Sequence, residues 1–441
     1  MTASTSSPKK FGPLRLMPGV GRRHITVYYL ATITSLLLFT FAPQAQPFVL
    51  TEILGIPESQ QGVLSGNIAF VAELVILASI GSWGVLSDRL GRRPIFAAGF
   101  LIMAVGLYLI PQATTVFQLY LYRCIFALGA AAGTTMVATV IADYVVDEDR
   151  GKGSGMQGIG NGIGAMLTVF VLLRFPEIFQ ESGSSPTEAA QSTYLIAAII
   201  GIISAIVMWL GLQGRTEQQI EQKKGWLQRT REGFGAARDP GVALAYAAAF
   251  VSRGDLAVVG TFFTLWATTY GTTEANLSAA EALATAGLVI GISQGVTLLT
   301  APIFGIMADR MNRVTAVLIA LALSGIGYGS TIFVESPLSG FIFISAALIG
   351  LGEISGVIAS GVLIAQQAPR DIRGSVIGVF SFCGAIGILA ATGIGGQLFD
   401  SWRPQGPFLL FSFFSFVALI WGLTIRHKVV PLNEDIESVG H

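Results

Sequence analysis

The feature of this sequence that most limits its possible folds is a series of twelve apolar stretches, each long enough to cross a membrane. A helix that spans about 30 Å of hydrocarbon needs roughly 20 mainly apolar residues. Only 12% of the 441 residues are charged, about half the fraction that is usual in soluble domains. The sequence therefore predicts an all-α membrane protein with twelve transmembrane helices. The stretches lie at 25–50, 62–87, 94–111, 115–143, 154–174, 191–212, 241–270, 281–307, 314–334, 338–366, 374–399 and 406–425.

The positive charges predict the orientation of these helices, because Lys and Arg concentrate in the cytoplasmic connections of membrane proteins. Of the 26 Lys and Arg residues, 22 lie in the terminal segments or in alternate connections, namely 88–93, 144–153, 213–240, 309–313 and 367–373. Arg174 and Arg403 lie in the opposite connections, whereas Arg123 and Arg253 lie inside apolar stretches. We therefore expect both termini in the cytoplasm and a multi-pass location in the plasma membrane, which is the inner membrane of a Gram-negative bacterium.

The two halves of the chain carry matching segments. GVLSDRLGRR after the second stretch corresponds to GIMADRMNRV after the eighth, and DEDRGKGSG after the fourth corresponds to PRDIRGSVIG after the tenth. Such a duplication is typical of secondary transporters, whose two six-helix bundles hold the binding site between them at midplane. We expect two pseudo-symmetric six-helix bundles at 25–213 and 241–425, with a cytoplasmic linker at 214–240 and cytoplasmic tails at 1–24 and 426–441.

The segment GVLSDRLGRRP resembles the signature loop of the major facilitator superfamily (MFS) of transporters. The positions that match are Gly84, Leu86, Asp88, Arg89, Gly91, Arg92 and Arg93, and the second copy retains Gly305, Asp309, Arg310 and Arg313. The resemblance covers nearly the whole chain and implies a secondary transporter with alternating access. In the family this loop is similar to a latch that closes the cytoplasmic side, to which Asp143, Arg150 and Arg373 contribute here. The alternative is that the arginines only fix the topology.

Five ionisable residues lie near the middle of the predicted spans, where each costs roughly 2.5–3.5 kcal/mol on insertion scales. They are Glu73, Arg123, Arg253, Asp255 and Glu353. We expect them to meet in a shared central chamber, together with the substrate-binding candidates Gln44, Gln46 and Gln294, and we expect Glu73, Asp255 and Glu353 to carry protons. Residues two apart on a helix point to different sides, so Arg253 and Asp255 are not expected to pair with each other.

Each of these assignments has an alternative. Gln44 and Gln46 lie between Pro43 and Pro47, so they either reach substrate in a wet cavity or sit in an ordinary proline bend. Arg253 either binds substrate or is locked to Glu353.

The fourth stretch, YRCIFALGAAAGTTMVATVIADY, resembles a second motif of the same family. Arg123, Gly129, Asp143 and Arg150 occupy the motif positions, while Ala127 replaces the family's first glycine. In members with this motif the arginine is associated with proton coupling. Glu73 is the neighbour on which we expect Arg123 to act, since a nearby charge shifts the pKa of a carboxyl group. The alternative is a static pair that holds two helices together.

These observations favour a proton-coupled transporter of a small organic solute. We expect an anionic or zwitterionic solute, because Arg123 and Arg253 give each half one central cation. The alternative is a proton-antiport efflux pump for drugs or metabolites, although the Gly-Pro dipeptide typical of exporters in the family is missing from 154–174. A non-transporting receptor on the same scaffold is a remote alternative.

The sequence gives little support to an enzyme. The three histidines, His24, His427 and His441, lie beside no nucleophile or metal-ligand set, and no phosphate loop or dinucleotide fingerprint occurs. We therefore expect no catalytic residue, no metal site and no cofactor. The net charge of zero gives no reason to expect a nucleic-acid partner. The expected partners are the lipid bilayer, the substrate and protons, and we expect the protein to work as a monomer.

Overall fold

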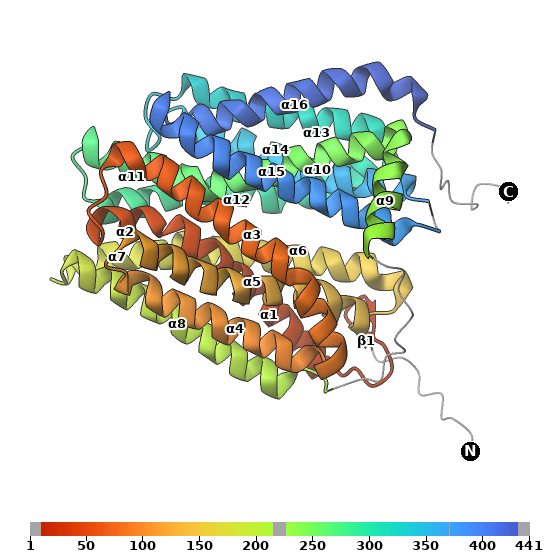
Figure 1. The fold of residues 1–441 in the computed structure, drawn as a ribbon, viewed down its shortest axis with the longest axis horizontal. Coiled ribbons are helices and arrows are strands. Elements are labelled where there is room, and N and C mark those ends of the chain that lie inside the picture. Colours follow the sequence, from red (N-terminus) through yellow and green to blue (C-terminus); the bar gives the residue numbers. More distant parts are fainter. Residues whose placement is uncertain (1–9, 215–225, 370, 431–441) are drawn as a thin grey trace. The chain divides into compact units, whose positions relative to one another are not determined.

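The computed structural model describes residues 10–214, 226–369 and 371–430, without the side chains of Asp147, Asp309 and residues 226–230. It confirms the all-α architecture (Figure 1). Twelve helical segments in the described part are long and apolar enough to cross a membrane, and they coincide with the twelve predicted stretches. They are Arg22–Glu52, Glu58–Leu90, Arg92–Gln112, Val116–Tyr144, Arg150–Glu181, Pro186–Gly211, Pro240–Thr273, Ala279–Ala308, Arg313–Phe333, Ile342–Gln367, Arg373–Ser401 and Gly406–Lys428.

Several of these segments consist of more than one helix. The helices of the first half are α1 (Arg22–Gln44), α2 (Gln46–Glu52), α3 (Glu58–Leu90), α4 (Arg92–Leu109), α5 (Val116–Tyr144), α6 (Arg150–Phe170), α7 (Phe175–Glu181) and α8 (Pro186–Gly211). Those of the second half are α9 (Trp226–Gly235), α10 (Pro240–Val258), α11 (Thr264–Thr273), α12 (Ala279–Arg310), α13 (Arg313–Gly329), α14 (Ile342–Gln367), α15 (Arg373–Ser401) and α16 (Gly406–Ile425). Short 3-10 turns extend some of them, and one π-helical turn, η5 (Val259–Phe263), joins α10 to α11.

The contacts divide the chain into two compact units. Unit 1 consists of Met1–Ile56, Val71–Gln219 and Ala279–Ala284, and unit 2 consists of Pro57–Phe70, Ile220–Ser278 and Thr285–His441. The first turns of α3 therefore group with unit 2, and the first turns of α12 group with unit 1. Boundaries drawn from the sequence place both segments in the other half, because hydrophobic patterning locates a span but not the neighbours of its end.

Glycines set the closest helix contacts within unit 1. In α6, a Cβ atom at Gly164 would collide with the carbonyl oxygen of Ile33 in α1. In α4, a Cβ atom at Gly106 would lie only 2.7 Å from the backbone of Phe126 in α5. Small residues are favoured at such places because helices in lipid associate by close backbone packing.

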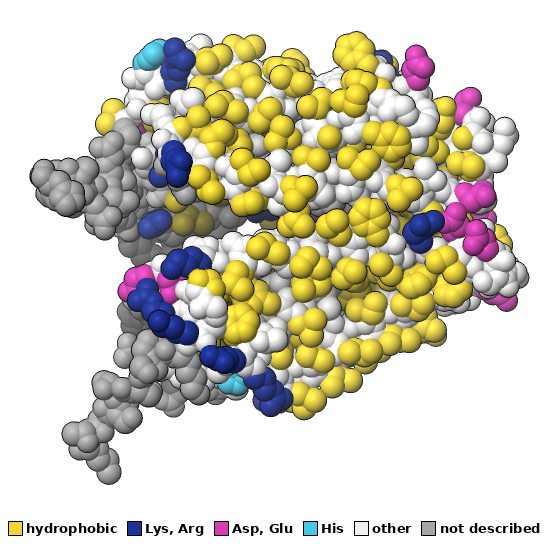
Figure 2. Space-filling view, turned by 180° about the vertical axis from the view of Figure 1, so that it is seen from behind, with side chains coloured by type: hydrophobic (Ala, Val, Ile, Leu, Met, Phe, Trp, Pro, Cys, Tyr) yellow, Lys and Arg dark blue, Asp and Glu magenta, His cyan; other side chains and the backbone are white. Residues whose placement is uncertain are grey.

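The surface of the helices is apolar. Large side chains such as Leu299, Ile303 and Ile420 are more than half exposed. On the face drawn in Figure 2, hydrophobic side chains cover the flanks of the helices, and most of the visible Lys and Arg side chains gather at the helix ends. This distribution is expected of helices whose flanks contact lipid.

The N-terminal segment that precedes α1 is folded rather than a simple tail. Strands β1 (Lys10–Phe11) and β2 (Leu14–Arg15) pair as an antiparallel hairpin. Leu16 then forms a bridge to Val145, the residue after α5, and the amide of Met17 donates to the carbonyl of Tyr144 at 2.9 Å. The side chains of Leu14 and Leu16 are completely buried. The described part of the predicted tail 1–24 is thus packed against unit 1.

Candidate functional site

Unit 2 contains two buried carboxyl groups that interact with each other. Asp255 of α10 is 1% exposed and Glu353 of α14 is 4% exposed. The hydroxyl of Ser324 in α13 donates to Asp255 Oδ2 at 2.5 Å, and it also forms a hydrogen bond of 3.0 Å with Ser415 in α16. Asp255 interacts electrostatically with Glu353, which is hydrogen-bonded to Gln294 of α12. Five helices of unit 2 therefore contribute to one cluster, which we name the carboxyl cluster: Asp255, Gln294, Ser324, Tyr328, Glu353 and Ser415.

Two glycines beside Glu353 explain how α14 brings it into this cluster. A Cβ atom at Gly350 would collide with the backbone of Ser293 in α12, next to Gln294. A Cβ atom at Gly352 would lie 2.6 Å from the Cα of Ser324 in α13. Because neither position tolerates a side chain, α14 approaches both helices closely, and the carboxylate of Glu353, the residue after Gly352, reaches their polar groups.

Three oxygen atoms of the carboxyl cluster have no hydrogen-bond partner among the described residues. They are Asp255 Oδ1, Glu353 Oε2 and Tyr328 Oη. Tyr328 is completely buried, and it interacts electrostatically with both carboxyl groups. It lies four residues after Ser324, hence on the same side of α13. Buried polar atoms without partners are rare in folded proteins, and each one calls for an explanation such as a bound ion or a chemical role.

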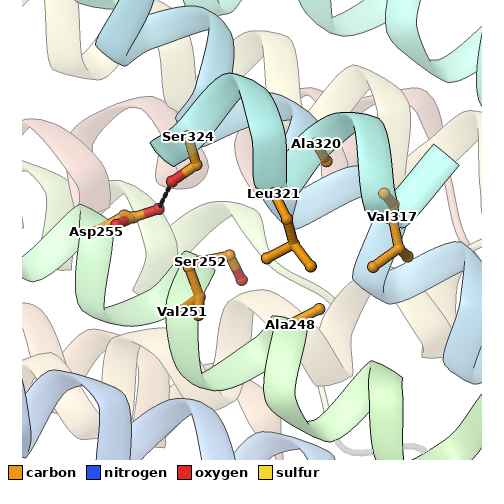
Figure 3. Close-up of a pocket in the computed structure, with 10 residues that line it drawn as sticks. Ala248, Val251, Ser252, Asp255, Val317, Ala320, Leu321 and Ser324 are labelled. Carbon is orange, nitrogen blue, oxygen red and sulfur yellow. Dashed lines mark hydrogen bonds between the residues drawn. The ribbon is translucent and has the colours of Figure 1, made fainter. Parts of the chain in front are cut away.

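A small cavity opens beside Asp255. Its volume is about 10 Å³, roughly the room for the centre of one water molecule. Its polar lining consists of Ser252, Asp255 and Ser324, and the rest is apolar, including Val317 and Ala320. Figure 3 shows Asp255 and Ser324, joined by their hydrogen bond, at one end of the lining and Val317 at the other. The cavity therefore has room for a very small guest only, next to a carboxylate.

Arg253 does not take part in this cluster. Its side chain is exposed, and its Cγ atom lies against Gly384 of α15. Asp255, two residues later, is buried, so the two side chains face different environments, as expected from their spacing. Glu353 is hydrogen-bonded to Gln294. The contact of Glu353 with Gln294 lends no support to the alternative in which Arg253 is locked to Glu353, which stays a prediction.

Unit 1 contains a buried cation. Arg123 of α5 is 5% exposed, and its guanidinium carbon lies 5.6 Å from the ring centre of Phe126. It also interacts electrostatically with Tyr194 of α8, whose ring lies 4.9 Å from that of Phe41 in α1. Arg123 Nε and Nη1 and the Tyr194 hydroxyl have no hydrogen-bond partner among the described residues. The neighbours of Arg123 thus include two aromatic rings and Cys124, and its pairing with Glu73 stays a prediction.

The prolines of the first span interrupt it as the sequence predicts. α1 ends at Gln44 and α2 begins at Gln46, with Pro43 inside α1 and Pro47 in the first turn of α2. Both glutamines are buried, and the Oε1 atom of each has no hydrogen-bond partner in the described part of the chain. Unsatisfied amide oxygens favour the alternative in which Gln44 and Gln46 bind a ligand. They do not favour the alternative in which both amides are hydrogen-bonded inside the bundle. Glu73 of α3 is partly buried, and its role stays a prediction.

The signature loop forms an ion-pair network around Arg92. Its Nε donates to Asp143 Oδ2 at 2.8 Å, and its Nη1 donates to Asp88 Oδ1 at 2.6 Å. Gly91 has a φ of 97°, a conformation that favours glycine, and it allows the sharp turn between α3 and α4. Arg93 lies 4.9 Å above the ring of Trp209. Asp88, Arg92 and Asp143 all belong to unit 1, and the role of this network as a latch stays a prediction.

The remaining residues of the predicted latch make simpler contacts. Arg150 donates to the carbonyl of Ala142 at 3.0 Å, and Arg313 donates to that of Ala308 at 2.6 Å. Arg89, Arg310 and Arg373 are exposed. The side chain of Asp309 lies outside the described residues.

A family model for the Major Facilitator Superfamily matches residues 27–298 and 281–439. The chain belongs to this superfamily. It is a multi-pass membrane protein of a transporter family, as its signature loop and twelve spans indicate.

Individual relatives are 24–28% identical to this MFS protein over the matched residues. Magnetosome protein MamH of Paramagnetospirillum magneticum is 28% identical over 397 residues, which cover 88% of this chain and 89% of MamH. Magnetosome protein MamZ of Magnetospirillum gryphiswaldense is 26% identical, but the match covers 87% of this chain and only 59% of MamZ. The multi-drug resistance efflux pump PmrA of Streptococcus pneumoniae is 24% identical over 76% of this chain and 82% of PmrA.

Solved structures confirm the fold. The crystal structure of the nucleoside transporter NupG superposes with a TM-score of 0.70 over 91% of this chain and 98% of that chain. The sequence identity is 14%, so the similarity shows the MFS fold and nothing about the substrate.

A buried acid next to α6 binds the N-terminal hairpin. The carboxylate of Asp149 pairs with Arg15 of the hairpin at 2.9 Å and with Lys152 at 2.8 Å. The backbone amide of Arg15 donates to the same carboxylate at 3.0 Å. The hydrogen bonds from the Arg15 and Lys152 side chains hold the pKa of Asp149 well below its usual range. This MFS protein thus fixes its N-terminal hairpin through a single buried acid.

Sequence reasoning missed the hydroxyl groups of the site. Ser324, Tyr328 and Tyr194 lie in apolar stretches where such residues are common. The available signal is the spacing of Ser324 and Tyr328, which places two hydroxyl groups on one side of a buried helix.

Proposed function

We propose that this protein is a proton-coupled transporter of a small organic solute with an anionic or zwitterionic character. The observation that carries the proposal is the buried pair Asp255 and Glu353. An ionised carboxyl group is costly to bury unless it is paired or takes up a proton. The charged side chain that acts on Asp255 in the described part of unit 2 is Glu353, another acid, so protonation is the simplest means of neutralising either carboxylate.

The anionic character of the solute is supported by Arg123. A guanidinium group offers a planar fork of donors that matches a carboxylate or a phosphate. Arg123 interacts with Phe126, Tyr194 and Cys124, and two of its nitrogens are without a hydrogen-bond partner among the described residues. We propose that these nitrogens bind an acidic group of the solute, and that the unsatisfied amide oxygens of Gln44 and Gln46 accept hydrogen bonds from donor groups elsewhere on the same solute.

Solute-driven proton movement in vesicles tests this proposal. The purified protein would be reconstituted with a pH-sensitive dye inside, and monocarboxylates, dicarboxylates, amino acids and phosphorylated metabolites would be added in turn. We expect a carboxylate-bearing or phosphorylated solute to move protons in the wild type but not in Asp255→Asn or Glu353→Gln.

Arginine variants test the second part of the proposal. Arg123→Ala should abolish the response and Arg123→Lys should weaken it, because lysine keeps the charge but loses the fork. Arg426→Ala, which removes an exposed arginine, is the matched control. A transported anion that moves no protons would contradict the coupling, and an unchanged response in Arg123→Ala would contradict the anion site.

The second candidate function is efflux of drugs or metabolites by proton antiport. The similarity to PmrA, a multi-drug resistance efflux pump, favours it, as does the arginine motif of α5. Responses limited to lipophilic cations in the same vesicles would support efflux in place of solute uptake.

The cellular location follows from the same proposal. We propose that the protein works as a monomer in the cell membrane, with both termini in the cytoplasm. The similarity to MamH and MamZ, which are named magnetosome proteins, makes an internal membrane the alternative. Membrane fractionation of cells that produce a tagged protein distinguishes the two.

A further inference from the structure

The carboxyl cluster has more negative charge than its surroundings explain. Asp255 and Glu353 lie on two different helices of unit 2. The groups around them are hydroxyls and an amide, which belong to Ser324, Ser415, Tyr328 and Gln294. Arg253, the nearest arginine in sequence, is exposed and directed toward α15. One proton neutralises only one of the two acids, so a second positive charge is needed whenever the pair is ionised.

The unsatisfied atoms of the cluster are all oxygens. Asp255 Oδ1, Glu353 Oε2 and the phenolic oxygen of Tyr328 are buried without hydrogen-bond partners among the described residues. Tyr328 is independent of the acidic pair, and its burial against both carboxyl groups leaves its oxygen facing the same region. Carboxylate, hydroxyl and amide oxygens are the ligands of hard cations, whereas zinc and copper prefer nitrogen and sulfur.

The burial of the cluster limits the kind of cation that it can hold. Asp255, Glu353 and Tyr328 are almost completely buried, and the cavity of about 10 Å³ is lined by Asp255 but by neither Glu353 nor Tyr328. An ion held by these three side chains therefore has to shed its water. Magnesium gives up its water reluctantly, and the cost of removing an ion from water rises with its charge, so a singly charged ion suits this buried site better than magnesium or calcium.

We propose that the carboxyl cluster is a binding site for one dehydrated sodium-sized monovalent cation, held by Asp255, Glu353 and Tyr328. The inference rests on the proposed function in one respect, since the same two acids take up protons. Sodium and protons then compete for the site, and sodium is bound when the acids are ionised. The hydrogen bond from Ser324 holds the Asp255 carboxylate so that its second oxygen stays available to the ion.

Thermal unfolding of the purified full-length protein in detergent tests this inference. Choline chloride would be replaced by sodium, lithium, potassium, magnesium or calcium chloride at constant ionic strength and at two or more pH values. A ligand that binds only the folded state raises the unfolding temperature in proportion to the logarithm of its concentration above its Kd. We expect sodium and lithium to raise it at pH 8.5, and the half-saturating sodium concentration to increase by up to about tenfold for each unit of lower pH.

Three variants and one control localise the site. Asp255→Asn and Glu353→Gln should lose the sodium response, and Tyr328→Phe, which removes one oxygen and keeps the ring, should weaken it. Glu335→Gln, which changes an exposed acid of unit 2, should respond like the wild type. If Asp255→Asn fails to fold, binding of radioactive sodium to Tyr328→Phe and to the wild type gives the comparison.

The outcomes separate this inference from the proposed function. Proton-driven transport without any sodium-specific stabilisation would overturn the inference and leave the proposed function standing. Sodium binding without proton-driven transport would do the reverse. A larger stabilisation by magnesium or calcium, or a sodium response that survives in both acid variants, would overturn the assignment of the site.

Discussion

Replacing Leu16 by alanine should release the N-terminal hairpin from unit 1 without unfolding the protein. Leu16 is completely buried, and it lies in the short segment that joins the hairpin to α1. Truncation of a buried leucine to alanine costs about 2–5 kcal/mol. The backbone bonds that tie this segment to unit 1, Met17 to Tyr144 and Arg15 to Val146, form a small contact that can open locally.

The expected magnitude follows from this cost. Each 1.36 kcal/mol is a factor of ten, so the opening equilibrium of the hairpin should increase by about 30- to 5,000-fold. Hydrogen exchange measured by mass spectrometry on peptides that contain Met17 and Val146 reports this opening directly. Peptides from α13 in unit 2 should exchange as in the wild type.

The neighbouring residue supplies a matched control. Met17→Ala removes a side chain that is 38% exposed, so its cost should stay within about 0.5 kcal/mol and its exchange within about twofold of the wild type. If Leu16→Ala exchanges no faster than Met17→Ala at Val146, the two buried leucines do not hold the hairpin, and the argument from burial is refuted.

Three further predictions concern other parts of the fold. Because the pKa of Asp149 is depressed, its contribution to docking is fully present above the ordinary carboxyl pKa, begins to fall below about pH 4 and is lost as the pH falls through the lowered pKa. A spin label near Gly12 should become progressively more mobile over this acidic range, and it should be mobile at neutral pH in Asp149→Asn. Gly164→Val should lower the free energy of unfolding by about 3 kcal/mol, measured by denaturation in detergent, whereas Gly158→Val in the same helix faces open space and should cost far less. Asp88→Asn should cost at most about 1 kcal/mol of stability yet slow transport in vesicles severalfold, and a wild-type rate would contradict the latch.

The fold was predictable because each span can be identified from its own residues. The twelve apolar stretches, the basic linker and the repeated signature loop can be recognised without knowing which helices pack together. All twelve stretches correspond to helical spans. The docked hairpin was not predictable in this way. Leu14 and Leu16 are two apolar residues in a short, basic segment, and only the position of the end of α5 shows that both are buried.

The candidate site shows the same limit at the level of single charges. The sequence identifies Arg123, Asp255 and Glu353 as ionisable residues at membrane depth, but pairing depends on rotation about each helix axis, at 3.6 residues per turn. An error of one residue in the alignment of a helix with its neighbours rotates the expected direction of a side chain by about 100°. Such an error is enough to assign the side chain to a different partner. The hydrogen bond between Glu353 and Gln294, for example, could not be derived from the positions of the two residues along the chain.

The way these charges are buried bears on their function. If they only held helices together, the structure would pair them, because a buried charge without a partner is far more costly than a buried ion pair. Instead, unit 1 buries a cation among aromatic rings and unit 2 buries two acids among hydroxyl groups. Each arrangement becomes favourable only when something of the opposite charge binds, an acidic group at Arg123 and a cation at Asp255 and Glu353. A transporter requires this property, since a site satisfied in the absence of its ligand gains nothing from binding it.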